Sequence, residues 1–303
     1  MLYLGIDTSN YTTSASLVSE DGEVVADSRL PVTVGDGERG IRQSDAVFTH
    51  IKNLPSVLDG LCDIKALGAV GVSYAPRDAE GSYMPCFLSG VSAAKAAAVA
   101  SGTSYFEFSH QAGHIAAAVC TAGRDDLLNE RFLAFHVSGG TTDLLLCEGL
   151  KITQIGGTLD LNAGQAIDRV GVMLGLKFPC GKELEEISLP LNSVKPYSCV
   201  KGTSCNLSGL ENKASDMLKK GESREYIAAF TLASVLETLD KMCKNALSEY
   251  GELPVVFAGG VTANKYIKDA LSAKYNAIFT LPEYSRDNAV GIAYLARKKA
   301  LGI

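Results

Sequence analysis

Short apolar runs separated by polar turns recur twice along the chain and predict two similar groups of β-strands. The first group comprises three apolar runs: 2–7, 14–18 and 24–30. The second group follows about 130 residues later and comprises three more: 132–137, 143–147 and 150–155. Runs of this length bounded by turn residues are typical of strands. Because the same order of strands and turns appears twice, the pattern predicts two halves of related topology.

Apolar residues at helical spacing predict helices between and after these strands. The predicted helices include the segments 44–61, 88–100, 163–176 and 224–250, a helix from Lys265 and a C-terminal helix. Further strands are predicted at four places: 67–73, 103–108, 253–258 and 277–280. The segment 190–205 has weak periodicity and is expected to be irregular. Strands that alternate with helices are typical of α/β sheets, and 303 residues fit two domains of ordinary size.

Composition narrows the class of protein. The chain is 47% hydrophobic, and none of its eight cysteines forms a Cys-x-x-Cys pair, so we expect reduced, buried thiols. No apolar run reaches the ~18 residues of a membrane span, and the first residues lack the pattern of a secretion signal. These features predict a cytoplasmic protein without a membrane anchor. The net charge of -6 argues against nucleic-acid binding by bulk electrostatics, so a local basic patch or a basic partner would have to supply it.

The clearest candidates for chemistry are His110 and His114, in the run Ser-His-Gln-Ala-Gly-His. The alanine-rich sequence that follows favours a helix, on which residues four apart share one face. The strand 103–108 precedes them, so the pair lies at a strand-to-helix junction. Two unrelated surface or capping histidines would explain the spacing equally well. A third ligand is needed to decide.

Asp287, near the start of the C-terminal helix, is our candidate for that third ligand. A carboxylate is stabilised at the beginning of a helix by the helix dipole. Two imidazoles and one carboxylate are a recurrent ligand set for zinc or ferrous iron with open coordination positions. The sequence therefore predicts a metal centre built from two distant segments.

Three loops rich in small residues are candidates for binding a phosphate or a nucleotide. They are the segments 8–13 and 138–142 and the turn at Gly259 and Gly260. Glycine, serine and threonine let backbone amides approach a phosphate closely. Each loop alone could be an ordinary hairpin turn, but three in one chain favour a ligand. Asp168, at the start of a glycine-rich helix, could bind a ribose hydroxyl or interact with the helix dipole.

Together these motifs resemble those of the actin, hexokinase and Hsp70 superfamily. More closely, they resemble the TsaD family, formerly called O-sialoglycoprotein endopeptidase or glycoprotease, over nearly the whole chain. The shared motifs are His-x-x-x-His (110–114), Ser-Gly-Gly (138–140), Ala-Gly-x-Ala-x-Asp (163–168), Ser-Gly-Leu (208–210), Gly-Gly-Val-x-Ala-Asn (259–264) and Asp-Asn (287–288). The resemblance implies an α/β, two-lobed actin-like fold with duplicated ribonuclease-H-like halves. The expected lobes are 1–108, with the helix 288–303 packed back on it, and 109–287, with the metal and nucleotide site in the cleft.

The resemblance also implies an activity, the transfer of a threonylcarbamoyl group from threonylcarbamoyl-AMP to the adenosine next to the anticodon of tRNA. By this analogy His110, His114 and Asp287 hold one divalent metal, iron or zinc, which polarises the transferred group. The residues expected to hold the adenylate or ATP are Val137, Ser138, Gly139, Gly140, Asp168, Gly181, Gly259, Gly260 and Asn264. No catalytic side chain is assigned. The implied partners are a smaller actin-like homologue and an ATPase, and the helices 88–100 and 109–120 are candidate contact faces.

The chain departs from the family pattern in the middle of the site. Asn-Tyr-Thr-Thr at 10–13 replaces Cys-Asp-Glu-Thr, which removes two carboxylates near the reacting centre. Thr141 stands where a histidine usually follows Ser-Gly-Gly, and Ala-Pro-Arg at 75–77 replaces Gly-Pro-Gly. These changes keep open a paralogue that binds an adenylate and metal but serves another acceptor or a scaffolding role. A metalloendopeptidase is the weakest alternative, because Gln111 replaces the glutamate of His-Glu-x-x-His proteases.

Overall fold

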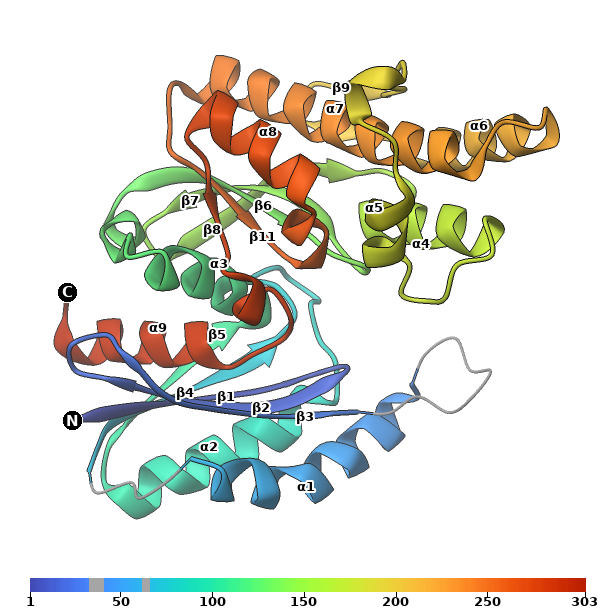
Figure 1. Cartoon of the computed structure of the whole chain (residues 1–303). Helices are drawn as coiled ribbons and strands as arrows, with labels where there is room; N and C mark the ends of the chain where they lie inside the picture. The colour runs from blue at the N-terminus through green and yellow to red at the C-terminus, as the bar shows by residue number, and fades with distance from the viewer. Residues whose placement is uncertain (33–40, 62–65) are drawn as a thin grey trace. The chain divides into compact units, whose positions relative to one another are not determined.

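The computed structural model describes residues 1–32, 41–61 and 66–303 of the chain. The chain forms two compact units: unit 1 comprises Met1–Asp125 and Arg286–Ile303, and unit 2 comprises Asp126–Ser285. Each unit contains one β-sheet with helices packed on it (Figure 1). Within the described ranges, no helix combines the length and the apolar character needed to cross a membrane.

The sheet of unit 1 has five strands in the order β3-β2-β1-β4-β5. Its strands are β1 (Leu2–Ser9), β2 (Thr12–Ser19), β3 (Val24–Pro31), β4 (Leu67–Ala75) and β5 (Ser104–Ser109). The first three form an antiparallel meander, and β4 and β5 continue the sheet beyond β1 as parallel strands. The apolar runs predicted from the sequence in this part of the chain are confirmed as strands to within two residues at each end.

Helices cover both faces of this sheet (Figure 1). On one face lie α1 (Gln43–Asp59) and α2 (Phe87–Ser101), and on the other lie α3 (His110–Thr121) and α9 (Val290–Leu301). Alternate residues of β1 serve the two faces, as in any strand. Leu4 and Ile6 pack in the core under α1 and α2. Gly5 lets α9 approach from the other side, because a Cβ at this position would lie 2.4 Å from the Ala289 carbonyl oxygen.

The boundary of unit 1 differs from the expected boundary at residue 108. Helix α3 belongs to unit 1, because it packs along α9 and also contacts β4 and β5. The C-terminal helix packs on β1 and β4 of the same unit. Asp287 likewise belongs to unit 1, although the expected second lobe included it. All three predicted metal ligands therefore lie in one unit.

The sheet of unit 2 has seven strands in the order β12-β11-β6-β7-β8-β10-β9. Its strands are β6 (Arg131–Val137), β7 (Thr142–Glu148), β8 (Lys151–Thr158), β9 (Val200–Lys201), β10 (Ser204–Cys205), β11 (Val255–Ala258) and β12 (Ile278–Phe279). The five strands β8-β7-β6-β11-β12 repeat the order of the unit 1 sheet, with the same antiparallel and parallel pairings. This repeat confirms the predicted α/β fold with duplicated halves.

Five helices belong to unit 2: α4 (Ala163–Met173), α5 (Gly181–Ile187), α6 (Ser208–Lys219), α7 (Arg224–Tyr250) and α8 (Lys265–Tyr275). They share a core with the sheet, in which Leu133, Phe135 and Leu144 of the strands pack with Ile227 and Leu239 of α7. The bounds of α7 are those predicted from the sequence. The sequence did not predict α5 or α6. The cysteines of the described residues are free thiols and most are buried, as composition predicts.

Short 3₁₀ turns connect several of these elements: η1 (Asp125–Asn129), η2 (Leu191–Ser193), η3 (Gly260–Ala263) and η4 (Pro282–Tyr284). The segment 190–205 contains only η2 and the two-residue strands β9 and β10, so the expectation of irregular structure there is confirmed. The predicted Gly-Gly turn after β11 forms the start of η3, with Gly259 as its cap and Gly260 as its first residue, and α8 follows.

Candidate functional site

Helix α3 begins where β5 ends, and its first residue is His110. The Ser109 side chain caps the helix by accepting a hydrogen bond from the Ala112 amide at 3.1 Å. Such a cap satisfies one of the amides that have no partner within the first turn. The alanine-rich sequence then continues the helix, so that His114 lies one turn after His110. The predicted helical pair at a strand-to-helix junction is confirmed.

Two glycines bring Asp287 to this pair. Gly113 lies between the histidines on α3, and Gly291 lies four residues after Asp287 on α9. A Cβ on Gly291 would lie 1.8 Å from the carbonyl oxygen of Gly113, and a Cβ on Gly113 would lie 2.9 Å from Ile292. The two helices can therefore cross this closely only because both residues lack a side chain. The crossing places the segment before α9 beside the first turns of α3.

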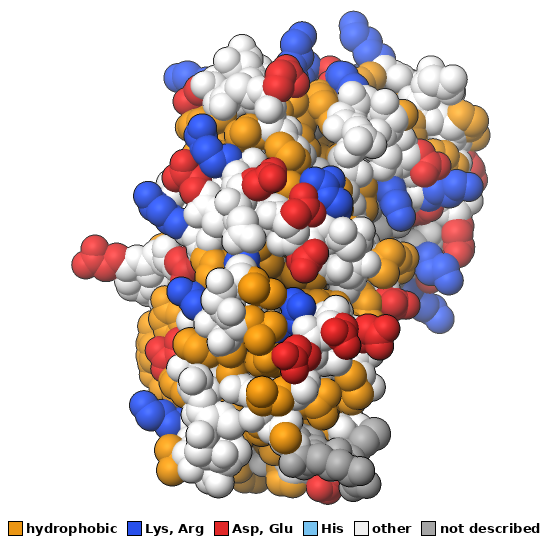
Figure 2. Space-filling model, turned by 90° about the vertical axis from the view of Figure 1, so that its left-hand side faces the viewer, with side chains coloured by type: hydrophobic (Ala, Val, Ile, Leu, Met, Phe, Trp, Pro, Cys, Tyr) orange, Lys and Arg blue, Asp and Glu red, His pale blue; other side chains and the backbone are white. Residues whose placement is uncertain are grey.

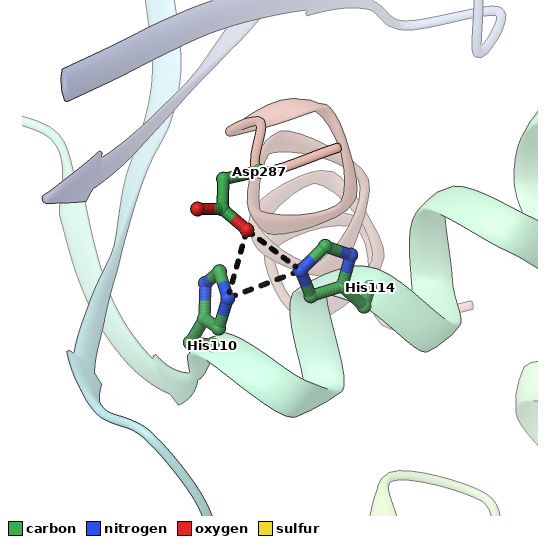
Figure 3. Close-up of side chains that lie close together, drawn as sticks. All are labelled: His110, His114 and Asp287. Carbon is green, nitrogen blue, oxygen red and sulfur yellow. Dashed lines mark hydrogen bonds and ion pairs between the residues drawn. The ribbon is translucent and has the colours of Figure 1, made fainter. Parts of the chain in front are cut away.

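The three predicted ligands converge on one point (Figure 3). The Nε2 atoms of His110 and His114 lie 3.0 Å apart. The Oδ1 atom of Asp287 lies 3.6 Å from Nε2 of His110 and 3.4 Å from Nε2 of His114. A metal with ligands at about 2.1 Å holds two of them about 3.0 Å apart at a right angle and about 3.4 Å apart at the tetrahedral angle. The three side chains thus fit a divalent cation as a possible metal site.

A fourth group supports this triad from behind His110. Asp7 of β1 is fully buried, and its Oδ1 atom lies 3.0 Å from Nδ1 of His110. Burial alone would raise the pKa of Asp7, but the charge and hydrogen bond of His110 outweigh burial and lower it. Burial would lower the pKa of His110, whereas Asp7 and Asp287 raise it to about 10. The pKa of Asp287 is well below its usual range, because hydrogen bonds from both histidines outweigh its burial.

The turn between β1 and β2 lies in unit 1 next to the beginning of α1. Gln43 donates a hydrogen bond from Nε2 to the Asn10 side chain at 2.8 Å, and its Oε1 atom accepts one from the Cys86 amide at 3.3 Å. Further along α1, Nδ1 of His50 lies 2.8 Å from the Thr13 hydroxyl. Side chains of α1 therefore fix the turn in which uncharged residues replace the two carboxylates of the family pattern.

The residues expected to bind a nucleotide all lie in unit 2, and local contacts join several of them. Close packing holds the loop that contains Ser138: a Cβ on Gly164 would lie 2.6 Å from the Ser138 carbonyl, and one on Gly259 would lie 2.5 Å from the Val137 carbonyl. Asp168 accepts a hydrogen bond from the Cys180 amide at 2.8 Å, next to Gly181. Burial raises the pKa of Asp168, partly offset by that amide.

Four glycines of these loops have no role in the fold. At Gly139, Gly140, Gly181 and Gly260 an added Cβ would meet nothing within 4 Å, and the backbone angle φ is not positive. Every other glycine in the described ranges either has a positive φ or would bring its Cβ into contact with a neighbouring atom. The fold therefore does not require glycine at these four positions, and their backbone is open to the close approach of a ligand.

Two further residues of interest were missed by the sequence analysis. Asp7 was included in the first predicted strand, although a carboxylate at the end of a buried apolar run is a signal that could have been used. Glu185 of α5 accepts hydrogen bonds from the Asn264 side chain at 2.7 Å and from the Lys265 amide at 3.3 Å. It thereby brings a carboxylate to Asn264. No sequence signal pointed to Glu185, because α5 was not predicted.

The chain has a fold of the actin, hexokinase and Hsp70 type, and unit 1 brings two histidines and one aspartate together. The fold recurs in (R)-2-hydroxyglutaryl-CoA dehydratase component A of Acidaminococcus fermentans, with a TM-score of 0.60, 18% identity and 99% coverage of both chains. A ROK family glucokinase of Streptomyces griseus has a TM-score of 0.56 and 12% identity, and the match covers 98% of this chain and 100% of the glucokinase. These likenesses show the fold alone.

Sequence similarity identifies the family, which the structural likeness does not. The model of the TsaD family, described as tRNA N6-adenosine threonylcarbamoyltransferase, matches residues 37–294, and the chain belongs to this family. A tRNA N6-adenosine threonylcarbamoyltransferase of Thermosipho africanus is 30% identical, over 98% of this chain and 94% of that protein. The resemblance inferred from the motifs is thereby confirmed.

Proposed function

We propose that this protein transfers a threonylcarbamoyl group from threonylcarbamoyl-AMP to the adenosine next to the anticodon of tRNA, in a metal-dependent reaction. One observation carries the proposal. His110, His114 and Asp287 come from segments more than 170 residues apart, yet their ligand atoms lie within 3.6 Å of one another in a chain of the TsaD family. The close crossing of Gly113 and Gly291, which brings these three side chains together, supports the proposal.

In the proposed reaction His110, His114 and Asp287 hold one divalent cation, iron or zinc. When bound, this cation would supply Lewis acidity to the carbonyl of the group that is transferred. The side chains themselves fix the position of that charge, because α3 carries both imidazoles and α9 is locked against α3 by Gly113 and Gly291.

The adenylate binds, in this proposal, to the predicted loops of unit 2. Val137 and Ser138 with Gly139 and Gly140 provide backbone amides at the end of β6. The remaining predicted contacts come from other elements: Asp168, Gly181, Gly259, Gly260 and Asn264. Support comes from the four glycines whose open Cβ positions the fold does not require. A nucleotide phosphate can approach such backbone amides without meeting a side chain.

The tRNA and the protein partners require surfaces outside the centre. On the face drawn in Figure 2, Lys and Arg side chains are mixed with Asp and Glu side chains, so this face offers no continuous basic surface. A basic partner would then have to contribute to tRNA binding. Of the two helices considered as contact faces for a smaller actin-like homologue, α3 is buried over 111–119, whereas α2 exposes Leu88 and Val99. We therefore place that partner on α2.

A paralogue that binds an adenylate and metal but serves another acceptor is the second candidate. One observation favours it: the turn between β1 and β2, held by Gln43 and His50, presents Tyr11 and Thr12 where family members carry carboxylates. If those carboxylates take part in transfer to tRNA, their loss would change the acceptor while the metal and adenylate sites persist.

Complementation separates these candidates. The gene is expressed in a strain from which its own transferase has been depleted, and threonylcarbamoyladenosine is measured in hydrolysed tRNA by mass spectrometry. Restoration of the nucleoside by the wild-type chain, and its absence with His114→Ala, supports the transferase. A purified chain that binds a threonylcarbamoyl-AMP analogue and metal, but restores no modification when the partner proteins of this chain's own host are co-expressed, supports the paralogue.

A further inference from the structure

Asp7 is a buried carboxylate, and burial of its charge costs free energy. The residue lies in the buried part of β1 and has 0% exposure. Its Oδ1 atom lies 3.0 Å from Nδ1 of His110, and its Oδ2 atom accepts a hydrogen bond from the Ser9 amide at 3.3 Å. An apolar side chain at such a position is often as stable as a buried charge pair, or more stable. Stability alone therefore does not explain why a carboxylate occupies this place.

The two nitrogens of His110 face different groups. Nδ1 faces Asp7, whereas Nε2 faces His114 and Asp287 at 3.0 and 3.6 Å. A neutral imidazole carries one N–H, and its other nitrogen has a lone pair that can bind a metal. A carboxylate has only acceptor oxygens, so Asp7 keeps the proton of a neutral His110 on Nδ1. The lone pair then lies on Nε2, the nitrogen that faces the other two ligands.

Charge gives Asp7 a second effect. A divalent cation bound by two neutral imidazoles and the carboxylate of Asp287 would leave a net charge of +1 in a largely buried place. The carboxylate of Asp7, one imidazole away, brings the formal total to zero. Because charges attract strongly where water is excluded, this second carboxylate favours the bound cation.

We propose that Asp7 is a positioning residue of the metal centre, which fixes the tautomer and orientation of His110 and thereby sets the affinity for the cation. The inference rests on the part of the proposed function that assigns the cation to His110, His114 and Asp287. It does not depend on what group is transferred or on the identity of the acceptor. Asp7 itself does not touch the cation.

Direct metal binding tests this role. Zn²⁺ alone is titrated into the purified full-length chain in competition with a chromophoric chelator, for the wild type, Asp7→Asn and Asp7→Ala. Loss of a carboxylate that orients a ligating histidine typically weakens metal binding about 10- to 100-fold. We expect a loss in this range for Asp7→Ala and a smaller loss for Asp7→Asn, whose amide oxygen still accepts from Nδ1 but carries no charge. Wild-type affinity in both variants would overturn the proposal.

A matched control comes from the neighbouring strand. Ser73 of β4 is buried on the strand next to Asp7, and its hydroxyl has no hydrogen-bond partner within the described residues. Ser73→Ala removes a polar group from the same wall and should keep wild-type zinc affinity. If Ser73→Ala weakened zinc binding as much as Asp7→Ala, disturbance of the wall would explain the effect and the positioning role would be wrong.

A spectroscopic readout covers the case in which Asp7→Ala does not fold. Asp7→Asn has nearly the same size and keeps the backbone contacts, so it serves as the folded comparison. In ¹⁵N NMR of the zinc-loaded wild type, His110 should carry its proton on Nδ1 and bind zinc through Nε2. Ligation of wild-type His110 through Nδ1 would contradict the proposal. Failure of the tRNA assay with an intact affinity order would reject the transferase and leave the role of Asp7 standing.

Discussion

The two units have the same strand order but use it to build different sites. In unit 1 the candidate metal ligands are the side chains of His110, His114 and Asp287, which close helix packing brings together beside Asp7. In unit 2 the candidate ligand groups are mostly backbone amides in loops whose glycines face open space. A duplicated sheet thus supplies two scaffolds, and the difference between them lies in the connections that follow the strands. Metal chemistry needs rigid side chains, whereas a nucleotide needs accessible backbone.

Removal of a carboxylate from each unit is the strongest way to test this division. Asp287→Ala deletes one of three ligands, so zinc affinity should fall more than about 100-fold, beyond what loss of a supporting residue costs. Its affinity for an adenine nucleotide should not change. Asp168→Asn should do the reverse and weaken nucleotide binding roughly tenfold, the effect of one charged hydrogen bond. Isothermal titration of both ligands on both variants measures the division, and a loss of both affinities in either variant would contradict it.

Helix packing in unit 1 is tested at the crossing of α3 and α9. Gly291→Ala would place a methyl group 1.8 Å from the Gly113 carbonyl oxygen and 2.7 Å from the Ala117 amide. Backbone atoms cannot rotate away, so the helices must separate, at a cost of about 2–3 kcal/mol in the free energy of unfolding. Asp287 would move with α9, and zinc affinity should fall as well. Urea denaturation and zinc titration measure the two effects, and an unchanged zinc affinity would show that the crossing does not position Asp287.

Asp160 offers a smaller test within unit 2. Its carboxylate accepts hydrogen bonds from the Leu207 amide and the Ser208 hydroxyl at the start of α6. Burial would raise the pKa of Asp160, but these hydrogen bonds outweigh burial and lower it below the usual value of 3.8. Because the folded-state pKa is lowered, the stabilisation is present above pH 3.8 and is lost as the pH falls below it.

We therefore expect Asp160→Asn to lower the free energy of unfolding by about 1 kcal/mol at pH 7, the usual value of a helix cap. The difference from the wild type should shrink as the pH falls below 4. Denaturation curves across this pH range provide the measurement. A constant difference down to pH 2 would mean that ionised Asp160 is not the stabilising form. Zinc affinity should be the same in both proteins, since Asp160 lies in unit 2.

Gly140→Ala in unit 2 is expected to have the smallest effect on stability, and it is the most direct comparison with Gly291→Ala in unit 1. Gly140→Ala makes the same chemical change as Gly291→Ala, but its methyl group would meet nothing within 4 Å. The free energy of unfolding should therefore change by less than about 0.5 kcal/mol, as at an ordinary surface position. Nucleotide affinity should nevertheless fall, because the added methyl group enters the space that a phosphate would occupy. If Gly140→Ala bound the nucleotide as the wild type does, this loop would be an ordinary turn.

Much of the fold could be predicted because local patterns and tertiary structure agree. The strands of both meanders alternate with clear turns, and α7 is long enough for its apolar stripe to define both ends. Helix α5 has only seven residues and α6 depends on Asp160, which lies far from it in sequence, so neither had a sufficient local signal. Where contacts with distant residues stabilise a helix, the sequence of the helix alone does not predict it.

The candidate metal ligands could be predicted from the sequence, whereas the role of Asp7 could not. His110 and His114 have a helical spacing that can be recognised, and Asp287 precedes a helix that could be anticipated. Asp7 acts through the far nitrogen of His110, and only the packing of α3 across β1 and β4 brings the two together. A supporting residue of this kind has no fixed spacing from the residue it supports. The boundary between the units differs from the expected boundary at residue 108 because α3 packs on α9, a contact between distant segments that the sequence does not reveal.

The return of the chain to unit 1 after Ser285 has a consequence for biosynthesis. A ribosome makes both imidazoles of the centre early, but Asp287 and α9 emerge only after all of unit 2 has been translated. A nascent chain that stops before this point carries the histidines without their carboxylate, and α3 lacks the helix that it packs along. In the proposed centre, high-affinity cation binding therefore requires that unit 2 has been translated and that α9 has packed along α3.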